Sequence, residues 1–453
     1  ITPPFQVPDE PSHFAYVKQL AESHALPSSS RREFSEEENV VLLDLRQTPY
    51  MPATGTISSL AQQRRFEREL DAAAEEPREG SPAAGVATSQ PPLYYAYEAI
   101  PYTLAYGANL LGRLALMRLF SALLGGLTAL FVYLFLREAL PASRFGALAG
   151  GLAVAFAPLL GFMSGAVNPD ALLFAVSAAL FWSLARSFRR GLTYRRTVSI
   201  GMIVAVGLLS KVNFLGLLPG AIAGLAVLSW RARSGGRISP RHAFALGTAI
   251  GLFPAVAYAL ANLAAGQAAF GFASSAATLV HGSWLRALEY TWKLFLPRLP
   301  FLHPYVPGLF TTKAIWLNGF VGQYGWLETS FPGWVYDLAM VVAALLQAAT
   351  ALALVSLRAT VRERLAELCV YALMALGLLI LIGGASFYSV GGGESYTQAR
   401  YLLPLLCLFA AGLALAARAL GRRLEPVLGT LIVLALFADD IFSQLLVIAR
   451  YYG

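Results

Sequence analysis

TVSIGMIVAVGLLSKVNFLGLLPGAIAGLAVLSW, residues 197–230, is apolar along almost its whole length. A helix needs about 20 residues to cross about 30 Å of hydrocarbon, so this run is too long for one span and long enough for two short ones. The polar residues 210–213, Ser-Lys-Val-Asn, interrupt it. The stretch therefore predicts a membrane hairpin, and it sets the pattern for an all-α polytopic membrane protein.

The composition of the whole chain supports this class. Hydrophobic residues make up 57% of 453 and charged residues only 13%, and the mean hydropathy is +0.58. These values lie outside the range of soluble domains. The net charge of +8 comes from Lys and Arg in short loops rather than from a basic stripe, so we expect no nucleic-acid partner. Cys369 and Cys407 lie in apolar runs and indicate no disulfide framework.

Ten apolar stretches are predicted to span the membrane. They are Leu114–Leu136, Phe145–Met163, Pro169–Leu184, Thr197–Leu209, Phe214–Trp230, Ala243–Leu263, Trp334–Leu357, Leu365–Ile382, Tyr401–Leu420 and Val427–Ile448. Every second connection is rich in arginine, and by the positive-inside rule these connections face the cytoplasm. The N-terminal hundred residues, the other loops and the C-terminus are then extracytoplasmic.

Four regions follow from this topology. Residues 1–92 form a first extracytoplasmic loop with a juxtamembrane helix, and residues 93–263 a first group of membrane helices. Residues 264–333 form an amphipathic extracytoplasmic loop, and residues 334–453 the C-terminal membrane helices. Within the first region, Glu36–Glu38 and the run Asp71–Gly85 indicate a loop-rich centre with a flexible linker. Because the chain opens with Ile1 in an outside segment, we expect an upstream membrane helix, with a cleaved secretory signal as the alternative.

The first candidate site is the segment Pro8-Asp9-Glu10-Pro11-Ser12-His13. In a group-transfer reaction, a carboxylate at the membrane surface can deprotonate the hydroxyl of the molecule that accepts the group. Asp9 is therefore a candidate base, and Glu10 is a candidate ligand of that acceptor or of a metal. Carboxylate oxygens with His13 suit Mg, Mn or Ca, although the spacing does not require a metal. The alternative is a capped helix, with Asp9 at its N-cap and Pro11 in its first turn.

Three further candidates lie on the same predicted side. Tyr94, in Gln-Pro-Pro-Leu-Tyr-Tyr at 90–95, shapes a substrate pocket or belongs to an aromatic belt at the lipid interface. Asp170, after Asn168-Pro169, is a site residue or part of an ordinary helix cap. Lys211 holds the phosphate of a lipid-linked donor or extends to lipid headgroups.

The last candidates follow a glycine-rich loop, in residues 391–401. Arg400 stands at the mouth of a span, where its fork of donors suits a phosphate. Gln398 and Tyr401 flank it as candidate substrate-binding residues. The alternatives for Arg400 are contact with lipid headgroups and a structural ion pair. Because the arginine-rich loops place Asp9, Asp170, Lys211 and Arg400 on one face, we expect them to converge.

The chain resembles bacterial integral-membrane proteins of unassigned function that are grouped with the GT-C glycosyltransferases. The matching stretches are Pro-Asp-Glu-Pro-Ser-His at 8–13, Gln-Pro-Pro-Leu-Tyr-Tyr at 90–95, Val-Asn-Pro-Asp at 167–170 and Gln-Ala-Arg-Tyr-Leu-Leu-Pro at 398–404. The resemblance implies a GT-C fold, a polyprenyl-phosphate sugar donor, Asp9 as catalytic aspartate with Glu10 as its partner, and Arg400 on the donor phosphate. It also implies an acceptor that is a glycan, a lipid or a protein, and a place in the plasma membrane of a bacterial cell.

Two other classes of function are considered. A transporter or lipid flippase also has many spans, but it predicts two homologous halves and charges near the midplane. The charges here cluster at one face and no internal repeat is found, which favours the enzyme. An assembly or receptor protein that binds through its first outside region is the third option.

Overall fold

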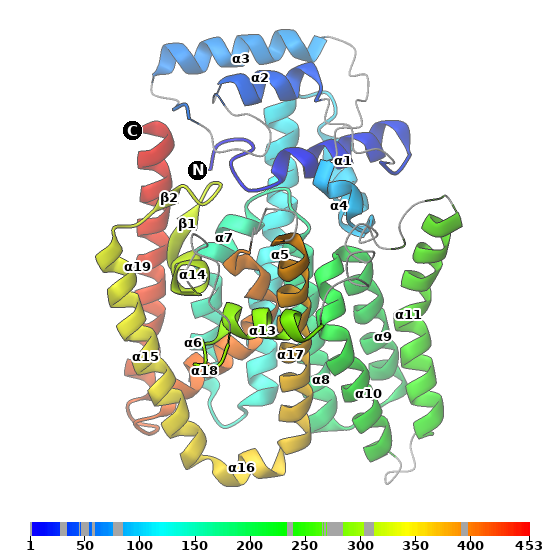
Figure 1. The fold of residues 1–453 in the computed structure, drawn as a ribbon, viewed down its shortest axis with the longest axis vertical. Helices are drawn as coiled ribbons and strands as arrows, with labels where there is room; N and C mark the ends of the chain where they lie inside the picture. The colour runs from blue at the N-terminus through cyan, green and yellow to red at the C-terminus, as the bar shows by residue number, and fades with distance from the viewer. Residues whose placement is uncertain are drawn as a thin grey trace.

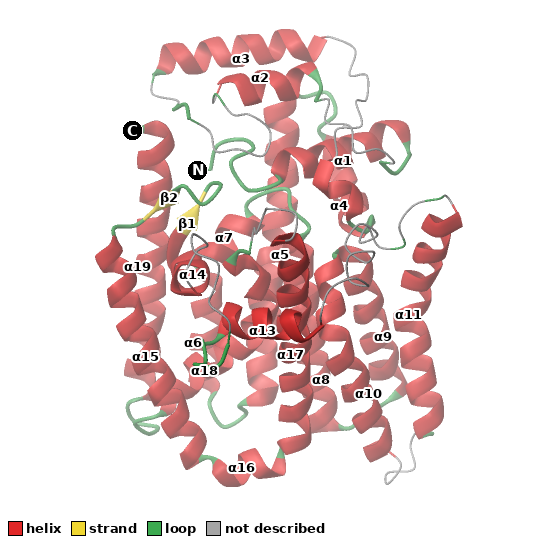
Figure 2. Cartoon of the chain, in the orientation of Figure 1, coloured by secondary structure: helices red, strands yellow, loops and turns green. Residues whose placement is uncertain are grey.

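The computed structural model describes most of the chain. The described residues are 2–27, 34–44, 46, 54–56, 59–75, 85–232, 239–264, 266, 269, 284–302, 312–390 and 397–453. They form a bundle of long helices with shorter helices at one end, as Figures 1 and 2 show. The expected class, an all-α polytopic membrane protein, is confirmed.

The helices are α1 (Glu10–Ser23), α2 (Glu36–Asp44), α3 (Leu60–Glu75), η1 (Gly85–Ser89), α4 (Leu93–Leu104), α5 (Leu110–Ala139), α6 (Arg144–Ala155), α7 (Pro158–Ser164), α8 (Asp170–Arg190), α9 (Tyr194–Ser210), η2 (Val212–Leu217), α10 (Leu218–Ala232), α11 (Pro240–Ala264), α13 (Trp284–Phe295), η4 (Lys313–Asn318), α14 (Gly319–Gly322), α15 (Gly333–Ser356), α16 (Arg358–Glu363), α17 (Leu365–Val390), η5 (Ala399–Leu405), α18 (Leu406–Arg418) and α19 (Glu425–Tyr452). Within the described ranges, the strands β1 (Gln323–Tyr324) and β2 (Thr329–Ser330) make one antiparallel pair.

The membrane spans agree closely with those expected from hydropathy. Among the described residues, eight helices are long and apolar enough to cross a membrane, and α6 with α7, bent by 53° at their junction, would make a ninth. Helix α9 has 17 residues, or about 25 Å at 1.5 Å per residue. The ten predicted spans correspond to these eight helices, the bent pair and α9.

The two ends of the bundle differ in composition. Helices α1–α3 and both chain ends lie at the upper end in Figure 1, here called the cap end. Helix α16 and the turn between α18 and α19 lie at the lower end, here called the arginine end. Arginine-rich connections from separate parts of the chain therefore gather at one end, as the alternation of loops predicts.

The centre of the first region is more ordered than its composition indicates. The acidic run Glu36–Glu38, expected in a loop, begins helix α2, and Glu37 and Glu38 are buried. Glu37 pairs with Arg113 of α5, whose guanidinium also donates to the Tyr102 hydroxyl at 2.7 Å. The expected flexible linker is wrong for residues 71–75, which end α3. Residues 76–84 of that linker lie outside the described residues.

Close helix contacts in the bundle depend on glycines. A Cβ added to Gly220 of α10 would lie 2.6 Å from the Met374 nitrogen and 2.8 Å from its Cα, in α17. A Cβ on Gly216 would lie 2.6 Å from the Leu378 Cα, one turn along. Membrane helices associate largely through such packing, because lipid tails are as apolar as the side chains that they would otherwise contact. The approach of α10 to α17 thus requires residues without a side chain.

We predict that two glycine-to-alanine changes differ in their effect on stability. Gly220→Ala should lower the free energy of unfolding by about 1–3 kcal/mol, because the added methyl meets the α17 backbone. Gly126→Ala in α5, where no atom lies within 4 Å of the added Cβ, should leave stability unchanged or raise it by up to about 1 kcal/mol through helix propensity. Thermal unfolding of the purified proteins in detergent measures both. Equal midpoints for the two variants would contradict the close packing.

Candidate active site

Asp9 and Arg400, 391 positions apart, form an ion pair. Arg400 Nη2 donates to Asp9 Oδ2 at 2.8 Å. Asp9 stands immediately before α1, and Arg400 lies in the first turn of η5. The Arg400 side chain is 5% exposed and that of Asp9 26%. The carboxylate is therefore the member of the pair that a molecule from outside reaches first.

A second ion pair lies against the first. Lys211 Nζ is 2.8 Å from Asp170 Oδ1, and Asp170 Oδ2 is 3.8 Å from Arg400 Nη1. The Asp170 side chain is only 1% exposed. Asp9, Asp170, Lys211 and Arg400, here called the charge cluster, thus combine two carboxylates with two cations. Their charges balance, which is what burial of ionised groups requires.

Each member of the charge cluster lies at the end of a helix. Asp170 begins α8, where a carboxylate also faces the positive end of the helix dipole. Lys211 separates α9 from η2. These positions explain why residues far apart in sequence meet, since the helices that carry them end on the same side. Lys211 is paired and largely buried, so the alternative in which it extends to lipid headgroups is wrong. Arg400 is in a structural ion pair, as one alternative predicts.

The backbone turns Asp9 toward Arg400 instead of toward its own helix. Asp9 has φ 67°, in the left-handed region that residues other than glycine seldom occupy. Asp9 is at the N-cap of α1 and Pro11 lies in the first turn, as the alternative predicts, but the Asp9 side chain makes no capping hydrogen bond. Asn168 Nδ2 donates to the Pro8 carbonyl at 3.2 Å, which ties the segment before Asp9 to the turn that opens α8.

Glu10 anchors this segment. Arg118 of α5 donates to its two carboxylate oxygens from Nε at 2.8 Å and from Nη2 at 2.6 Å. The backbone N–H groups of Phe5 and Val167 donate to the same carboxylate at 3.0 and 3.1 Å. Glu10 is fully buried. Both oxygens of Glu10 are thus occupied by Arg118 and the backbone. Glu10 holds the neighbouring Asp9 in place and makes no ion pair with Lys211 or Arg400.

Arg118, which holds Glu10 beside the candidate site, is a residue that the sequence interpretation missed. It lies inside the expected span Leu114–Leu136, where an ionisable residue at membrane depth indicates a specific role. Besides Glu10, it contacts the first segment through two backbone carbonyls, those of Thr2 and Pro3. A lone arginine within an apolar run was the signal that could have identified it.

His13 is held by an aromatic stack. Its Nδ1 lies 2.9 Å from the Tyr95 hydroxyl, and the Tyr95 ring stacks on Tyr16 with ring centroids 3.6 Å apart. Burial lowers the pKa of His13 to about 3, with the Asp9 carboxylate opposing the shift and the cations of the charge cluster adding to it. His13 is therefore a neutral imidazole at physiological pH. Tyr95, which the sequence interpretation quoted without selecting it, fixes the ring.

The pKa of Asp9 reflects two opposing effects. Burial raises it, and the charge and hydrogen bond of the Arg400 guanidinium, with a smaller contribution from Lys211, act against burial and lower it. The net result is a pKa below the ordinary value for an aspartate. Asp9 is thus ionised at neutral pH while Arg400 is its partner, and a change in that partner alters its basicity directly.

The selected tyrosines have different surroundings. Tyr94 and Tyr95 are both fully buried, so the aromatic-belt alternative is wrong. The Tyr94 hydroxyl lies 2.7 Å from Ser121 Oγ, which donates to Glu98 at 2.8 Å. The Arg400 guanidinium lies over the Tyr401 ring, 5.3 Å from its centroid. Tyr401 thus belongs with the charge cluster, whereas the Tyr94 hydroxyl is engaged between α4 and α5.

A pocket opens beside Arg400. Gln398, Arg400 and Gln323 contribute polar groups to its lining, and Pro8 borders it next to Asp9. Its cavity volume is about 30 Å³, comparable to the space that one water molecule takes up in the liquid. Arg400 Nε and Nη1 are buried and have no hydrogen-bond partner within the part of the chain that the structure describes. Arg400 therefore retains donors for a ligand in addition to the one that Asp9 accepts.

The described residues contain no group of three His, Cys, Asp or Glu side chains that could hold a metal ion. Asp9, Glu10 and His13, considered together as possible metal ligands, have separate partners: Arg400, Arg118 and Tyr95. What the charge cluster offers directly is anion binding by cations and proton acceptance by a carboxylate.

Comparison with known proteins identifies the family. The chain belongs to the predicted membrane protein family DUF2142, whose model matches residues 1–409. The match includes every member of the charge cluster. No curated protein and no solved structure matches the chain. Membership agrees with the expected membrane family of unassigned function and with a multi-pass membrane protein.

The anchoring role of Glu10 predicts a large cost for its neutralisation. Glu10→Gln leaves the Arg118 charge without its partner, and breaking a buried ion pair costs about 3–5 kcal/mol of unfolding free energy. Glu69→Gln on α3, which breaks the exposed pair with Arg65, should cost at most about 1 kcal/mol. Unfolding of both variants in detergent measures the difference. Similar losses would show that Glu10 is not an anchor.

The depressed pKa of His13 predicts a pH dependence. Between about pH 6.5 and pH 3 the unfolded chain binds a proton at this residue and the folded chain does not, so stability falls on acidification by up to about 1.4 kcal/mol per pH unit. His13→Gln should remove this contribution, whereas His242→Gln, at an exposed position of α11, should keep it. Unfolding between pH 7 and pH 5 tests this. An unchanged slope in His13→Gln would refute the assignment.

Proposed function

We propose that this protein is a GT-C type membrane glycosyltransferase, which transfers a sugar from a polyprenyl-phosphate donor to an extracytoplasmic glycan, lipid or protein. The observation that carries the proposal is the charge cluster. Asp9 and Arg400 are in contact at 2.8 Å although they come from opposite ends of the chain. In the pocket beside them, Nε and Nη1 of Arg400 have no hydrogen-bond partner among the described residues.

Arg400 is the proposed ligand of the donor phosphate. Its fork of N–H donors suits the oxygens of a phosphate, and stabilising the departing charge requires cations more than a second acid. Lys211, 2.8 Å from Asp170, adds a point charge behind it. Gln398, two positions before Arg400, and Tyr401, directly after it, complete the proposed donor site with the pocket lining.

Asp9 is the proposed base. It removes the proton from the acceptor hydroxyl; the acceptor oxygen bonds to the anomeric carbon as the bond from that carbon to the phosphate oxygen breaks, and the lipid phosphate leaves with the electron pair. Attack opposite the leaving group inverts the configuration. Because Arg400 holds the pKa of Asp9 down, a phosphate that takes over the guanidinium would raise it. Donor binding would thereby make Asp9 a stronger base.

The position of the charge cluster favours an enzyme over a transporter. A transporter site lies near the bilayer midplane, between repeats, whereas all four charges here lie at helix ends toward the cap end. The gathering of arginine-rich turns at the other end supports an extracytoplasmic orientation for the cap end in a bacterial plasma membrane.

The test is sugar transfer by purified protein from a panel of radiolabelled polyprenyl-phosphate sugars. Asp9→Asn keeps the shape and removes the base, so turnover should fall by about 10²–10⁴-fold. Arg400→Lys keeps the charge and loses the fork, so donor binding should weaken as well. The matched control is Arg358→Gln at the arginine end. Equal turnover by wild type and Asp9→Asn would remove the proposed base, and transfer from no donor in the panel would overturn the enzyme assignment.

A further inference from the structure

A second group of charges lies at the arginine end, where helices α8 and α9 meet. Five arginines fall within eleven positions, and only residues 191–193 separate the two helices. Residues 171–288 contain no Asp or Glu at all. The group is therefore strongly cationic, and any acid that neutralises it must come from elsewhere in the chain. Its members are Arg186, Arg189, Arg190, Arg195 and Arg196.

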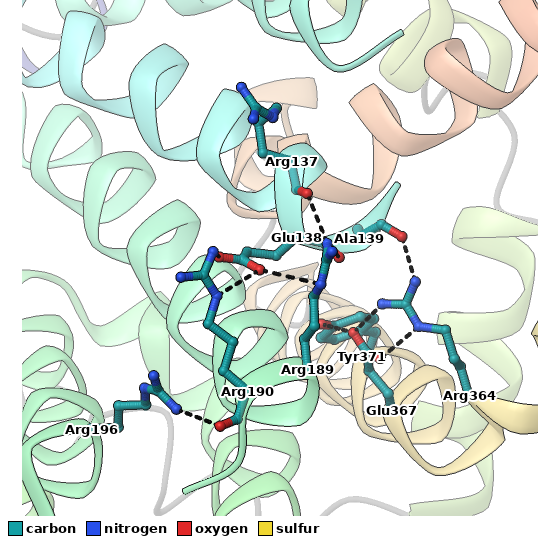
Figure 3. Close-up of polar contacts among 9 residues, drawn as sticks. All are labelled: Arg137, Glu138, Ala139, Arg189, Arg190, Arg196, Arg364, Glu367 and Tyr371. Atoms are coloured by element: carbon teal, nitrogen blue, oxygen red, sulfur yellow. Dashed lines mark hydrogen bonds and ion pairs between the residues drawn. The ribbon is translucent and has the colours of Figure 1, made fainter. Parts of the chain in front are cut away.

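Part of this charge is used to hold helices together, as Figure 3 shows. Glu138, at the end of α5, pairs with Arg190 at 2.5 Å and lies 3.8 Å from Arg189. Arg189 also donates to the carbonyl groups of Arg137 and Glu138, and Arg364 to that of Ala139. These cations satisfy the carbonyl end of α5, where helix groups lack partners of their own. The Glu138 carboxylate thus interacts with both Arg189 and Arg190.

The remaining arginines have no acidic partner among the described residues. Arg196 folds back and donates to the carbonyls of Arg190 and Gly191. Arg186 has a buried Nε without a hydrogen-bond partner in the described part of the chain. The guanidinium groups of Arg186 and Arg190 repel that of Arg196, and the Glu138 carboxylate, which attracts it, has a smaller effect than either. Held close by the short turn, the three arginines carry more positive charge than Glu138 alone offsets.

Aromatic side chains lie against two arginines at this end. The Arg186 guanidinium lies over the Trp182 ring at 5.4 Å, and that of Arg231 over Phe188 at 5.4 Å. The positive-inside rule assigns this arginine-rich end to the cytoplasmic side, so the proposal below places the group at the headgroups of that leaflet.

We propose that Arg186, Arg190, Arg195 and Arg196 form a binding site for the phosphate of an anionic phospholipid. A phosphate offers several acceptor oxygens to the guanidinium N–H groups that Glu138 does not engage, and its charge offsets the repulsion that remains among them. Basic pockets between membrane helices bind anionic headgroups in this way. The lipid would join α8 and α9 at their turn and reinforce the contact that Glu138 makes with α5. This site is independent of the charge cluster at the cap end.

Native mass spectrometry of the full chain in detergent tests the site, with dioleoyl phosphatidylglycerol as probe and dioleoyl phosphatidylcholine as its zwitterionic comparison. The variant is Arg186→Gln with Arg195→Gln, because neither side chain pairs with an acid among the described residues. Each arginine near an anionic lipid contributes about five-fold in affinity, so binding should weaken about thirty-fold. The matched control is Arg422→Gln with Arg423→Gln, both exposed at the turn between α18 and α19.

The outcomes separate the possibilities. Thirty-fold weaker phosphatidylglycerol binding in the site variant, with the control unchanged, supports the site. Equal losses in both variants indicate only general surface charge and overturn it, as does equal binding of phosphatidylcholine by the wild type. Inorganic phosphate at matched concentration forms the third arm. If it displaces the lipid or gives the same protection against thermal unfolding, the site takes a free anion and the lipid assignment fails.

Discussion

The buried Glu10 carboxylate is the contact on which the arrangement of the cap end depends. It accepts hydrogen bonds from Arg118 on α5, from the turn before α8 and from the first segment itself. Three parts of the chain are joined at one group that has no exposure to solvent. Because Asp9 precedes Glu10 directly, this contact also determines where the Asp9 carboxylate lies. The ion pair with Arg400 is thus set up by a neighbouring residue that takes no part in it.

The membrane architecture could be predicted from the sequence because each span satisfies its own backbone hydrogen bonds and carries its own apolar signal. The cap end could not. Glu37 and Glu38 suggest a loop by composition, yet they lie in α2, where Arg113 and Lys18 pair with them. Local propensity is a weak guide when a partner distant in sequence decides the outcome.

The sequence predicts that the four residues of the charge cluster come together, because each lies at a helix end on the same side of the membrane. It does not predict which residue pairs with which, since the pairing depends on the lateral order of the helices. Lys211 faces Asp170 because α9 lies beside α8. Glu10 and Asp9 are adjacent in sequence, yet the left-handed backbone at Asp9 sends them to different arginines. No periodic pattern in the sequence predicts that Asp9 and Glu10 pair with different arginines.

Helix α5 has 30 residues, or about 45 Å at 1.5 Å per residue, against about 30 Å of hydrocarbon. The helix is therefore about 15 Å longer than the hydrocarbon is thick. Arg113 and Arg118, which pair with Glu37 and Glu10 of the cap end, both lie near its first residue. Where this surplus stands beyond the lipid tails at the cap end, it holds α1 and α2 above the bilayer. A molecule that stays anchored in the lipid would have to extend its polar end over that distance to engage the groups held there.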